Sequence, residues 1–243
     1  MNIQENILYE DNELLVCRKP AGIAVQTARI AQMDMESLLK NYLAEEKRKE
    51  QKGEGHVTGS FVTGHSASGR KNMSAVKPGE NHRNINQPYL AVIHRLDQPV
   101  SGVLVFAKTA FAAKELNKQI TNHTMGKYYL AEVDGVIPKE TDTLTDYLLK
   151  DAKTNTSRVV PKGTPGAKEA TLHYRKKDDT HLEIELVTGR HHQIRVQLSH
   201  AGMPIAGDGK YNPNPGKESR LQLCAYRLEF RHPKTGKKMT FLY

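Results

Sequence analysis

The stretch that organises this chain is LAVIHRLDQPVSGVLVFA, residues 90–107. Two apolar runs, Leu90–Ile93 and Val103–Ala107, flank a polar loop that carries one carboxylate, Asp97, close to Arg95. Short apolar runs bounded by Pro and Gly predict buried strands. A loop pinned between two strands holds its side chains rigidly, which suits a reactive group. The same residues are also consistent with a turn carboxylate and a surface ion-pair partner.

Three further segments lie in order along the chain. They are KPAG at 19–22, KYYLA at 127–131, and TGRHHQIR at 188–195, which runs on to Asp208. Together with HRLD and the following Ser-Gly pair, this series resembles the motifs of the RluA-type RNA pseudouridine synthases. Unrelated chains would rarely reproduce four motifs in the same order. The resemblance covers the chain from about residue 7 to its end, and it implies a bent-sheet fold that isomerises uridine in RNA to pseudouridine.

The apolar pattern itself predicts a mixed α/β (α+β) fold with an antiparallel-rich sheet and flanking helices. A hairpin is expected from Ile7–Tyr9 and Leu14–Val16, which flank a polar turn. Apolar residues at helical spacing predict helices at about 35–44, from a cap at Thr109 to about 122, and from about 191 to a stop at Gly202. Further strands are expected at about 128–135, 170–174, 182–187, 226–230 and 239–242, with an irregular loop at 151–167.

Residues 45–86 differ in composition from the rest of the chain. They are rich in Lys, Glu, Gly, Ser, Asn and His and have almost no large apolar side chains. Such a segment buries too little surface to offset the entropy of ordering. We therefore expect a flexible insertion at about 45–86 within a single catalytic domain that spans residues 1–243, where the resembling family has a shorter connection.

The charge balance points to a polyanionic partner. The 243 residues include 36 Lys and Arg against 27 Asp and Glu, a formal net charge of +9. This suits RNA, although a basic surface alone does not identify the polyanion. No apolar run approaches the roughly 20 residues that cross a bilayer, and the first residues lack a signal-peptide pattern. We expect a cytoplasmic protein without a membrane partner, in which Cys17 and Cys224 are buried and reduced.

The resemblance makes Asp97 the expected catalytic residue. Whether it attacks the sugar as a nucleophile or removes a ribose proton stays open. Either role needs an ionised carboxylate, and burial raises the pKa of a carboxyl group. In the resembling family the arginine that matches Arg195 pairs with this carboxylate, and a guanidinium can bind it bidentately. The alternative for Arg195 is a solvated helix residue.

Tyr129 is the aromatic residue that the resemblance adds to the catalytic group. Its ring is suited to stacking on a flipped uracil, whereas Tyr128 faces the opposite side of the strand. The alternative for Tyr129 is an ordinary core position. Candidates for contacts to phosphate or the flipped base are basic residues within the motifs, any of which is also consistent with a surface charge: Arg95, Lys19, Arg190 and His192.

Metal and cofactor chemistry is not expected. Uridine isomerisation needs no redox step, and His191 and His192 would diverge by about 100° if both lay on a helix. We expect an RNA pseudouridine synthase that acts as a monomer without a cofactor on ribosomal or transfer RNA. A non-catalytic RNA-binding module on the same fold and a metal-dependent nuclease are the alternatives. Val100 and Gln197 depart from the residues common in the family, which leaves substrate identity open.

Overall fold

The computed structural model describes residues 2–28, 32–53, 87–216 and 220–243. In these residues the elements follow in chain order as η1 (Gln4–Asn6), β1 (Ile7–Glu10), β2 (Leu14–Lys19), α1 (Met35–Gly53), β3 (Ala91–Val92), β4 (Ser101–Ala107), α2 (Ala110–Thr121), β5 (Gly126–Glu132), β6 (Thr141–Asp151), β7 (Thr156–Val160), β8 (Lys168–Lys176), β9 (His181–Leu186), α3 (Gln193–His200), β10 (Leu223–Arg231) and β11 (Lys238–Leu242).

The described strands form one sheet in the order β1-β2-β4-β10-β5-β9-β8-β6-β7, with β3 paired to β4 and β11 paired to β10. Every described strand pair is antiparallel except β4 with β10. The antiparallel-rich mixed sheet expected from the sequence is therefore confirmed. Because β4 and β10 run in parallel, the loop that leads into β4 and the segment that leads into β10 lie at the same end of these two strands.

The neighbouring strands β2 and β4 are buried on both faces of the sheet. Cys17 of β2 and its partner Leu104 of β4 face one apolar cluster, and the neighbouring pair of Val16 and Val105 faces the other. Continuous apolar runs are typical of strands that are covered on both sides. The loop of Asp97 therefore leaves a rigid part of the core.

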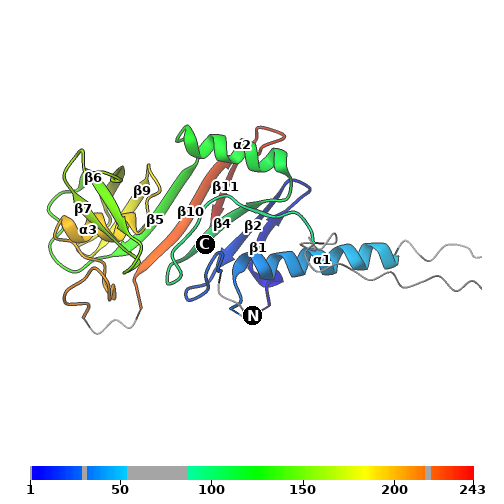
Figure 1. The fold of residues 1–243 in the computed structure, drawn as a ribbon, viewed down its shortest axis with the longest axis horizontal. Coiled ribbons are helices and arrows are strands. Elements are labelled where there is room, and N and C mark those ends of the chain that lie inside the picture. The colour runs from blue at the N-terminus through cyan, green and yellow to red at the C-terminus, as the bar shows by residue number, and fades with distance from the viewer. Residues whose placement is uncertain (1, 29–31, 54–86, 217–219) are drawn as a thin grey trace, which may run out of the picture.

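The helices lie on different parts of the sheet (Figure 1). In that view α2 crosses β4 and β10 near the top, α3 lies beside β6 and β7 at the left, and α1 projects at the right. The predicted cap of α2 is confirmed, because the Thr109 side chain accepts a hydrogen bond from the Ala112 amide. Its buried stripe is formed by Ala112, Ala113 and Leu116, whereas Phe111 is 52% exposed.

The first helix is longer than predicted. It runs to Gly53, so residues 45–53 of the expected flexible insertion are helical, and residues 54–86 lie outside the described part of the chain. Composition misled here because Lys, Glu and Gln are good helix formers even without apolar neighbours. Ion pairs one turn apart, Lys40 with Glu36 and Lys49 with Glu46, add to the stability of the helix.

The expected irregular loop at 151–167 is also wrong in part, because β6 ends in it and β7 lies within it. The β6 strand pairs with β8 along eight residues and with β7 on its other side. Its sequence is polar and half-exposed, so pairing with neighbours rather than an apolar pattern makes it a strand. The third helix begins at Gln193, two residues later than expected.

Candidate active site

The loop that carries Asp97 is held in place by a buried lysine. The Lys19 side chain is fully buried, and its ammonium group donates hydrogen bonds to the carbonyls of Pro20 (3.1 Å), Gln98 (3.0 Å) and Val100 (2.6 Å). Burial lowers the pKa of Lys19 to about 8, while Asp97 acts in the opposite direction. All three donors are in use, so the expected contact between Lys19 and phosphate is wrong. The structure makes Lys19 a support of the loop.

Gly102 allows the two parallel strands to approach at the end of this loop. It has a φ of +149°, and a Cβ at this position would lie 2.4 Å from the Cβ of Ala225 on β10. A side chain is therefore excluded where the Ser-Gly pair begins β4. This close approach brings the start of β10 beside the Asp97 loop.

Asp97 lies at the wall of a cavity and is only partly neutralised. Its side chain is 26% exposed, with one carboxylate oxygen 3.3 Å from Nη1 of Arg195 and 3.7 Å from Nε2 of His192. Burial raises the pKa of Asp97, and the nearby Asp208 raises it further, whereas Arg195 and Lys19 oppose the shift. The carboxylate is thus more basic than that of an ordinary aspartate.

Arg195 binds Asp208 more closely than it binds Asp97. Its Nε and Nη2 donate to the two carboxylate oxygens of Asp208 at 2.8 and 2.7 Å. The Asp208 side chain is fully buried, that of Arg195 is 6% exposed, and the expected pair with Asp97 is present through the remaining Nη1. One guanidinium is therefore shared by two carboxylates. Asp208 ends the last of the four motifs, but its sequence position alone did not indicate a role.

The turn that presents Asp208 is fixed by the preceding glycine. Gly207 has a φ of +70°, and a Cβ there would meet the Arg220 carbonyl oxygen at 2.0 Å. The Asp208 carboxylate also accepts hydrogen bonds from the amides of Lys210 and Tyr211. Backbone donors and the guanidinium together hold the pKa of Asp208 below its usual value against the effect of burial.

His192 belongs to the same group of side chains but lies just before α3. It has a left-handed backbone with a φ of +53°, and its Nδ1 is 2.7 Å from the Tyr211 hydroxyl. Its ring stacks on that of His191 at a centroid distance of 3.8 Å. The expected divergence of the two rings is therefore wrong, because they are not on the helix. Burial, followed by the charge of Arg195, lowers the pKa of His192 to about 3, so the ring is neutral.

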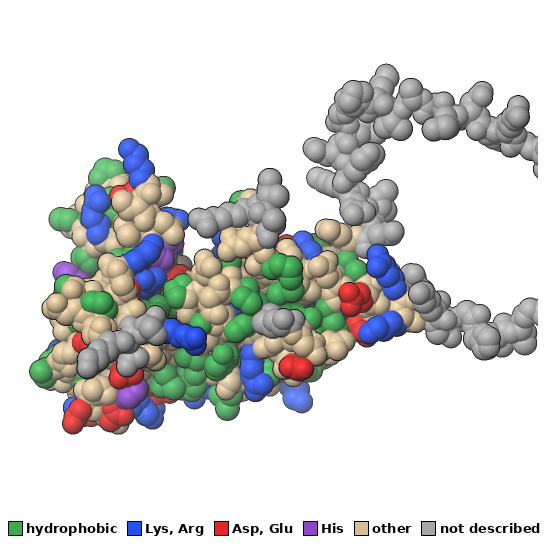
Figure 2. All heavy atoms as spheres, turned by 90° about the horizontal axis from the view of Figure 1, so that it is seen from below, with side chains coloured by type: hydrophobic (Ala, Val, Ile, Leu, Met, Phe, Trp, Pro, Cys, Tyr) green, Lys and Arg blue, Asp and Glu red, His purple; other side chains and the backbone are tan. Residues whose placement is uncertain are grey.

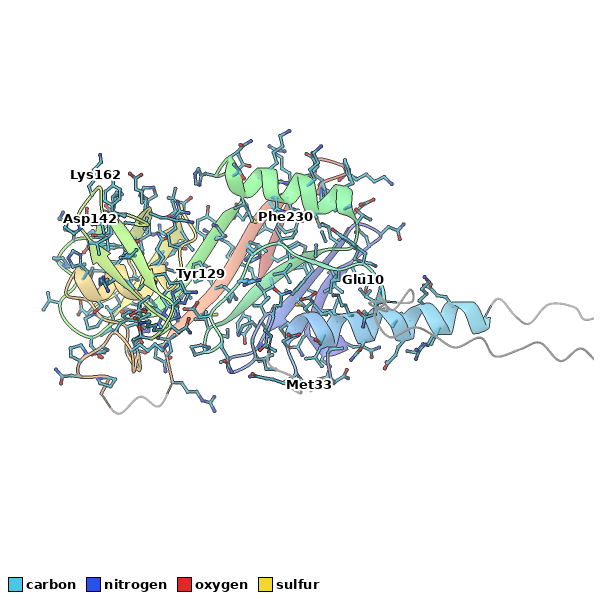
Figure 3. The ribbon with its side chains drawn as sticks, viewed as in Figure 1. Glu10, Met33, Tyr129, Asp142, Lys162 and Phe230 are labelled. Carbon is cyan, nitrogen blue, oxygen red and sulfur yellow. The ribbon has the colours of Figure 1, made fainter. Side chains whose placement is uncertain are left out.

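Tyr129 reaches the cavity from β5. The residue is 6% exposed and lines the same cavity as Asp97 and Arg195. Burial raises the pKa of the phenol, and Asp97 raises it further, so the hydroxyl stays protonated. Figure 3 labels Tyr129 at the middle of the molecule. Tyr128 lies on the opposite face, where the Arg227 guanidinium is 3.9 Å from its ring centroid.

Two adjoining cavities meet at Asp97. The first cavity is about 570 Å³ and includes Tyr129 and Arg190, and a second cavity of about 800 Å³ extends toward residues 21–26 and 207–210. Both include Arg95, which is exposed and donates a hydrogen bond to Gln26. Figure 2 shows Lys, Arg and His side chains beside the hollow left of the centre of the molecule.

The described residues contain neither a cluster of metal ligands nor a membrane-spanning helix. No group of three or more His, Cys, Asp or Glu side chains is placed to hold a metal ion in this part of the chain. No helix there is long and apolar enough to span a membrane. Cys17 is buried as expected, while Cys224 is only partly buried.

Comparison with known sequences identifies the family of this chain. The model of the RNA pseudouridylate synthase family matches residues 13–200. An uncharacterised RNA pseudouridine synthase of Bacillus subtilis (strain 168) is 32% identical over 97% of this chain and 67% of its own length. The ribosomal large subunit pseudouridine synthase C of Buchnera aphidicola subsp. Schizaphis graminum is also 32% identical, over 98% of this chain and 66% of its own length. The chain thus spans about two thirds of these relatives.

Solved structures agree on the fold. Human RNA pseudouridylate synthase domain containing 4 aligns with a TM-score of 0.68 at 19% identity, covering 99% of this chain and 88% of that one. The corresponding human domain containing 1 aligns with a TM-score of 0.65 at 18% identity, covering 98% and 82%. The family match over residues 13–200 and the relatives at 32% identity confirm what the four motifs predicted. The chain belongs to the RNA pseudouridylate synthase family.

Proposed function

We propose that this protein isomerises uridine to pseudouridine in RNA, with Asp97 as the catalytic residue. The observation that carries the proposal is the position of Asp97. Its carboxylate lies on a rigidly held loop, at the wall of a cavity that Tyr129 and Arg195 also line. This arrangement matches the needs of the reaction, because a reactive carboxylate must meet the sugar while the rest of the site retains the detached base.

The reaction breaks the bond between N1 of uracil and C1′ of ribose and forms a bond between C5 and C1′. The C5 hydrogen leaves as a proton and N1 gains one, so the product is an isomer and no oxidant is needed. Asp97 acts either as the nucleophile at C1′ or as the base that removes a ribose proton. The raised pKa of its carboxyl group makes the carboxylate a stronger base than an ordinary aspartate.

The surrounding residues have distinct proposed roles. Tyr129 stacks on the flipped uracil, and Arg195 keeps Asp97 ionised through Nη1 while Asp208 holds the guanidinium in place. Arg95 is exposed where both cavities meet, which suits a side chain that fills the gap left by the flipped nucleotide. His192, buried and neutral, orients the site more readily than it contacts phosphate.

The proposed substrate is large-subunit ribosomal RNA. Several relatives of about 30% identity carry the name ribosomal large subunit pseudouridine synthase C, among them that of Pasteurella multocida. The net charge of +9 suits any RNA, so transfer RNA is the comparison substrate. We further propose that the protein works in the cytoplasm as a monomer with one catalytic domain and without a cofactor.

Release of the C5 hydrogen gives a direct test. The purified protein is incubated with ribosomal RNA transcripts, and separately with transfer RNA transcripts, that carry tritium at C5 of uridine. We expect tritium release from the ribosomal transcript that persists in excess chelator. Cleavage of the transcripts that stops with chelator, without tritium release, supports the metal-dependent nuclease. RNA binding with neither cleavage nor release from either transcript supports a non-catalytic RNA-binding module.

A further inference from the structure

Lys127 is a largely buried lysine that the proposed reaction does not use. It lies on β5 two residues before Tyr129, and side chains two residues apart on a strand point to the same face. The residue is 9% exposed and lines the first cavity. Within the described residues, its ammonium group takes part in no hydrogen bond or ion pair. The nitrogen is therefore available to a ligand that enters the cavity.

The neighbours of Lys127 are cations rather than carboxylates. Nζ reaches the loop after β9, where a Cβ placed on Gly189 would be 3.8 Å away. Burial lowers the pKa of Lys127, and the charge of Arg190 lowers it further, with no opposing carboxylate in the described chain. Burial and the charge of Lys127 also lower the pKa of His94 to about 3. The protein itself therefore does not compensate this charge.

The cavity as a whole has an excess of positive charge. Asp97 is its one carboxylate among the described residues, and it is already engaged by Arg195. The cationic side chains that line the same cavity are Arg95, Lys127, Lys150, Arg190 and Arg195. A cavity with an excess of positive charge attracts negatively charged groups, so this arrangement favours the entry of an anionic group of a ligand.

We propose that Lys127 and Arg190 form a phosphate subsite that binds one phosphodiester of the RNA strand beside the uridine at Asp97. This inference rests on the proposed function. The strand rise places the Cα of Lys127 roughly 7 Å from that of Tyr129, a separation comparable to one nucleotide. Nε of Arg190 donates to the Glu169 carbonyl at 2.8 Å, which directs the guanidinium and leaves its terminal nitrogens for phosphate oxygens.

The first test compares matched losses of charge. Lys127→Gln is measured against Lys237→Gln, an exposed lysine between β10 and β11 that lines neither cavity. Binding of a short fluorescent oligouridylate is followed by anisotropy over a salt series. We expect Lys127→Gln to weaken binding roughly tenfold and to flatten the slope of log affinity against log salt by about 0.7. Lys237→Gln is expected to leave both nearly unchanged, and Lys127→Arg to retain the slope.

Thermal unfolding of the free protein separates binding from a structural role. Because Lys127 has no partner in the described protein, its replacement by Gln is expected to leave the melting temperature unchanged or raise it. A lower melting temperature together with normal RNA affinity would overturn the proposal and make Lys127 a structural residue.

The second test locates the phosphate. Oligouridylates that carry one neutral methylphosphonate linkage at successive positions are bound to the parent protein and to Lys127→Gln. We expect one position at which neutralisation weakens binding to the parent but not to the variant. Equal sensitivity of both proteins at every position would overturn the subsite. Tritium release tests the proposed function separately. If Lys127→Gln weakens binding but the parent protein releases no tritium, the subsite is supported and the isomerase is not. If the parent releases tritium but Lys127→Gln binds normally, the isomerase is supported and the subsite is refuted.

Discussion

Replacing Asp208 by Asn is expected to move the pH dependence of the enzyme in a direction that a general loss of structure does not produce. The carboxylate of Asp208 binds two nitrogens of Arg195 and raises the pKa of Asp97 by its charge. The amide removes that charge and one of the two acceptors. Arg195 then has Asp97 as its nearest carboxylate, so the pKa of Asp97 falls.

The expected loss in the free energy of unfolding follows from the burial of the ion pair between Arg195 and Asp208. Breaking a buried ion pair costs about 3–5 kcal/mol when one charge is left alone. Here Arg195 keeps Asp97 at 3.3 Å, so we expect the lower end, about 3 kcal/mol. For a chain of this size that corresponds to a melting temperature lower by about 6–12 °C.

The assay is the pH profile of tritium release under conditions where Asp208→Asn is still folded. Its acid limb is expected to move to lower pH than that of the parent. Arg195→Met, which removes the cation, is the matched comparison and is expected to move the acid limb to higher pH while losing most activity. If both variants shift the acid limb in the same direction, or Asp208→Asn leaves it in place, the guanidinium of Arg195 does not set the pKa of Asp97.

Three other results are expected. Asp97→Asn should abolish tritium release and leave RNA affinity nearly unchanged, since the amide keeps the shape but is neither base nor nucleophile; turnover in the purified variant would remove Asp97 from the chemistry. Tyr129→Phe should slow turnover without changing the salt dependence of binding, whereas Arg190→Ala should flatten the salt slope by about 0.7; the reverse pattern would exchange their roles. His94 and His192 have folded pKa values lowered to about 3 from 6.5, so the unfolded chain binds protons first as the pH falls. Urea unfolding should show a loss of about 2 kcal/mol per histidine between about pH 7 and pH 5, and unchanged stability over that range would contradict the burial of neutral rings.

The sequence predicted those elements whose signals are local. Thr109 caps α2 because a hydroxyl before an apolar stripe accepts an amide hydrogen bond, which needs no distant partner. The alternation at Tyr129 likewise placed its side chain on the buried face of β5. By contrast, β7 is a strand because β6 lies beside it, and no pattern within residues 156–160 carries that information.

The candidate site was predictable to the extent that motifs encode it. Asp97, Arg195 and Tyr129 do meet at one cavity. Lys19 was misjudged because a lysine in a motif looks cationic and accessible, whereas its burial depends on the path of the Asp97 loop. Asp208 was missed because its contact with Arg195 depends on the turn at Gly207, which the sequence does not show. The available signal was a carboxylate directly after a glycine within a motif.

The sharing of Arg195 between two carboxylates also bears on when the protein becomes active during folding. Asp97 and Arg195 are separated by 98 positions, Lys19 and Val100 by 81, and Arg195 and Asp208 by 13. The first two contacts form only after long stretches of chain have been brought together, which slows folding. A chain growing on a ribosome therefore cannot complete the candidate site until Asp208 has emerged. On refolding, we therefore expect activity to return together with closure of the whole sheet rather than with the formation of any single part.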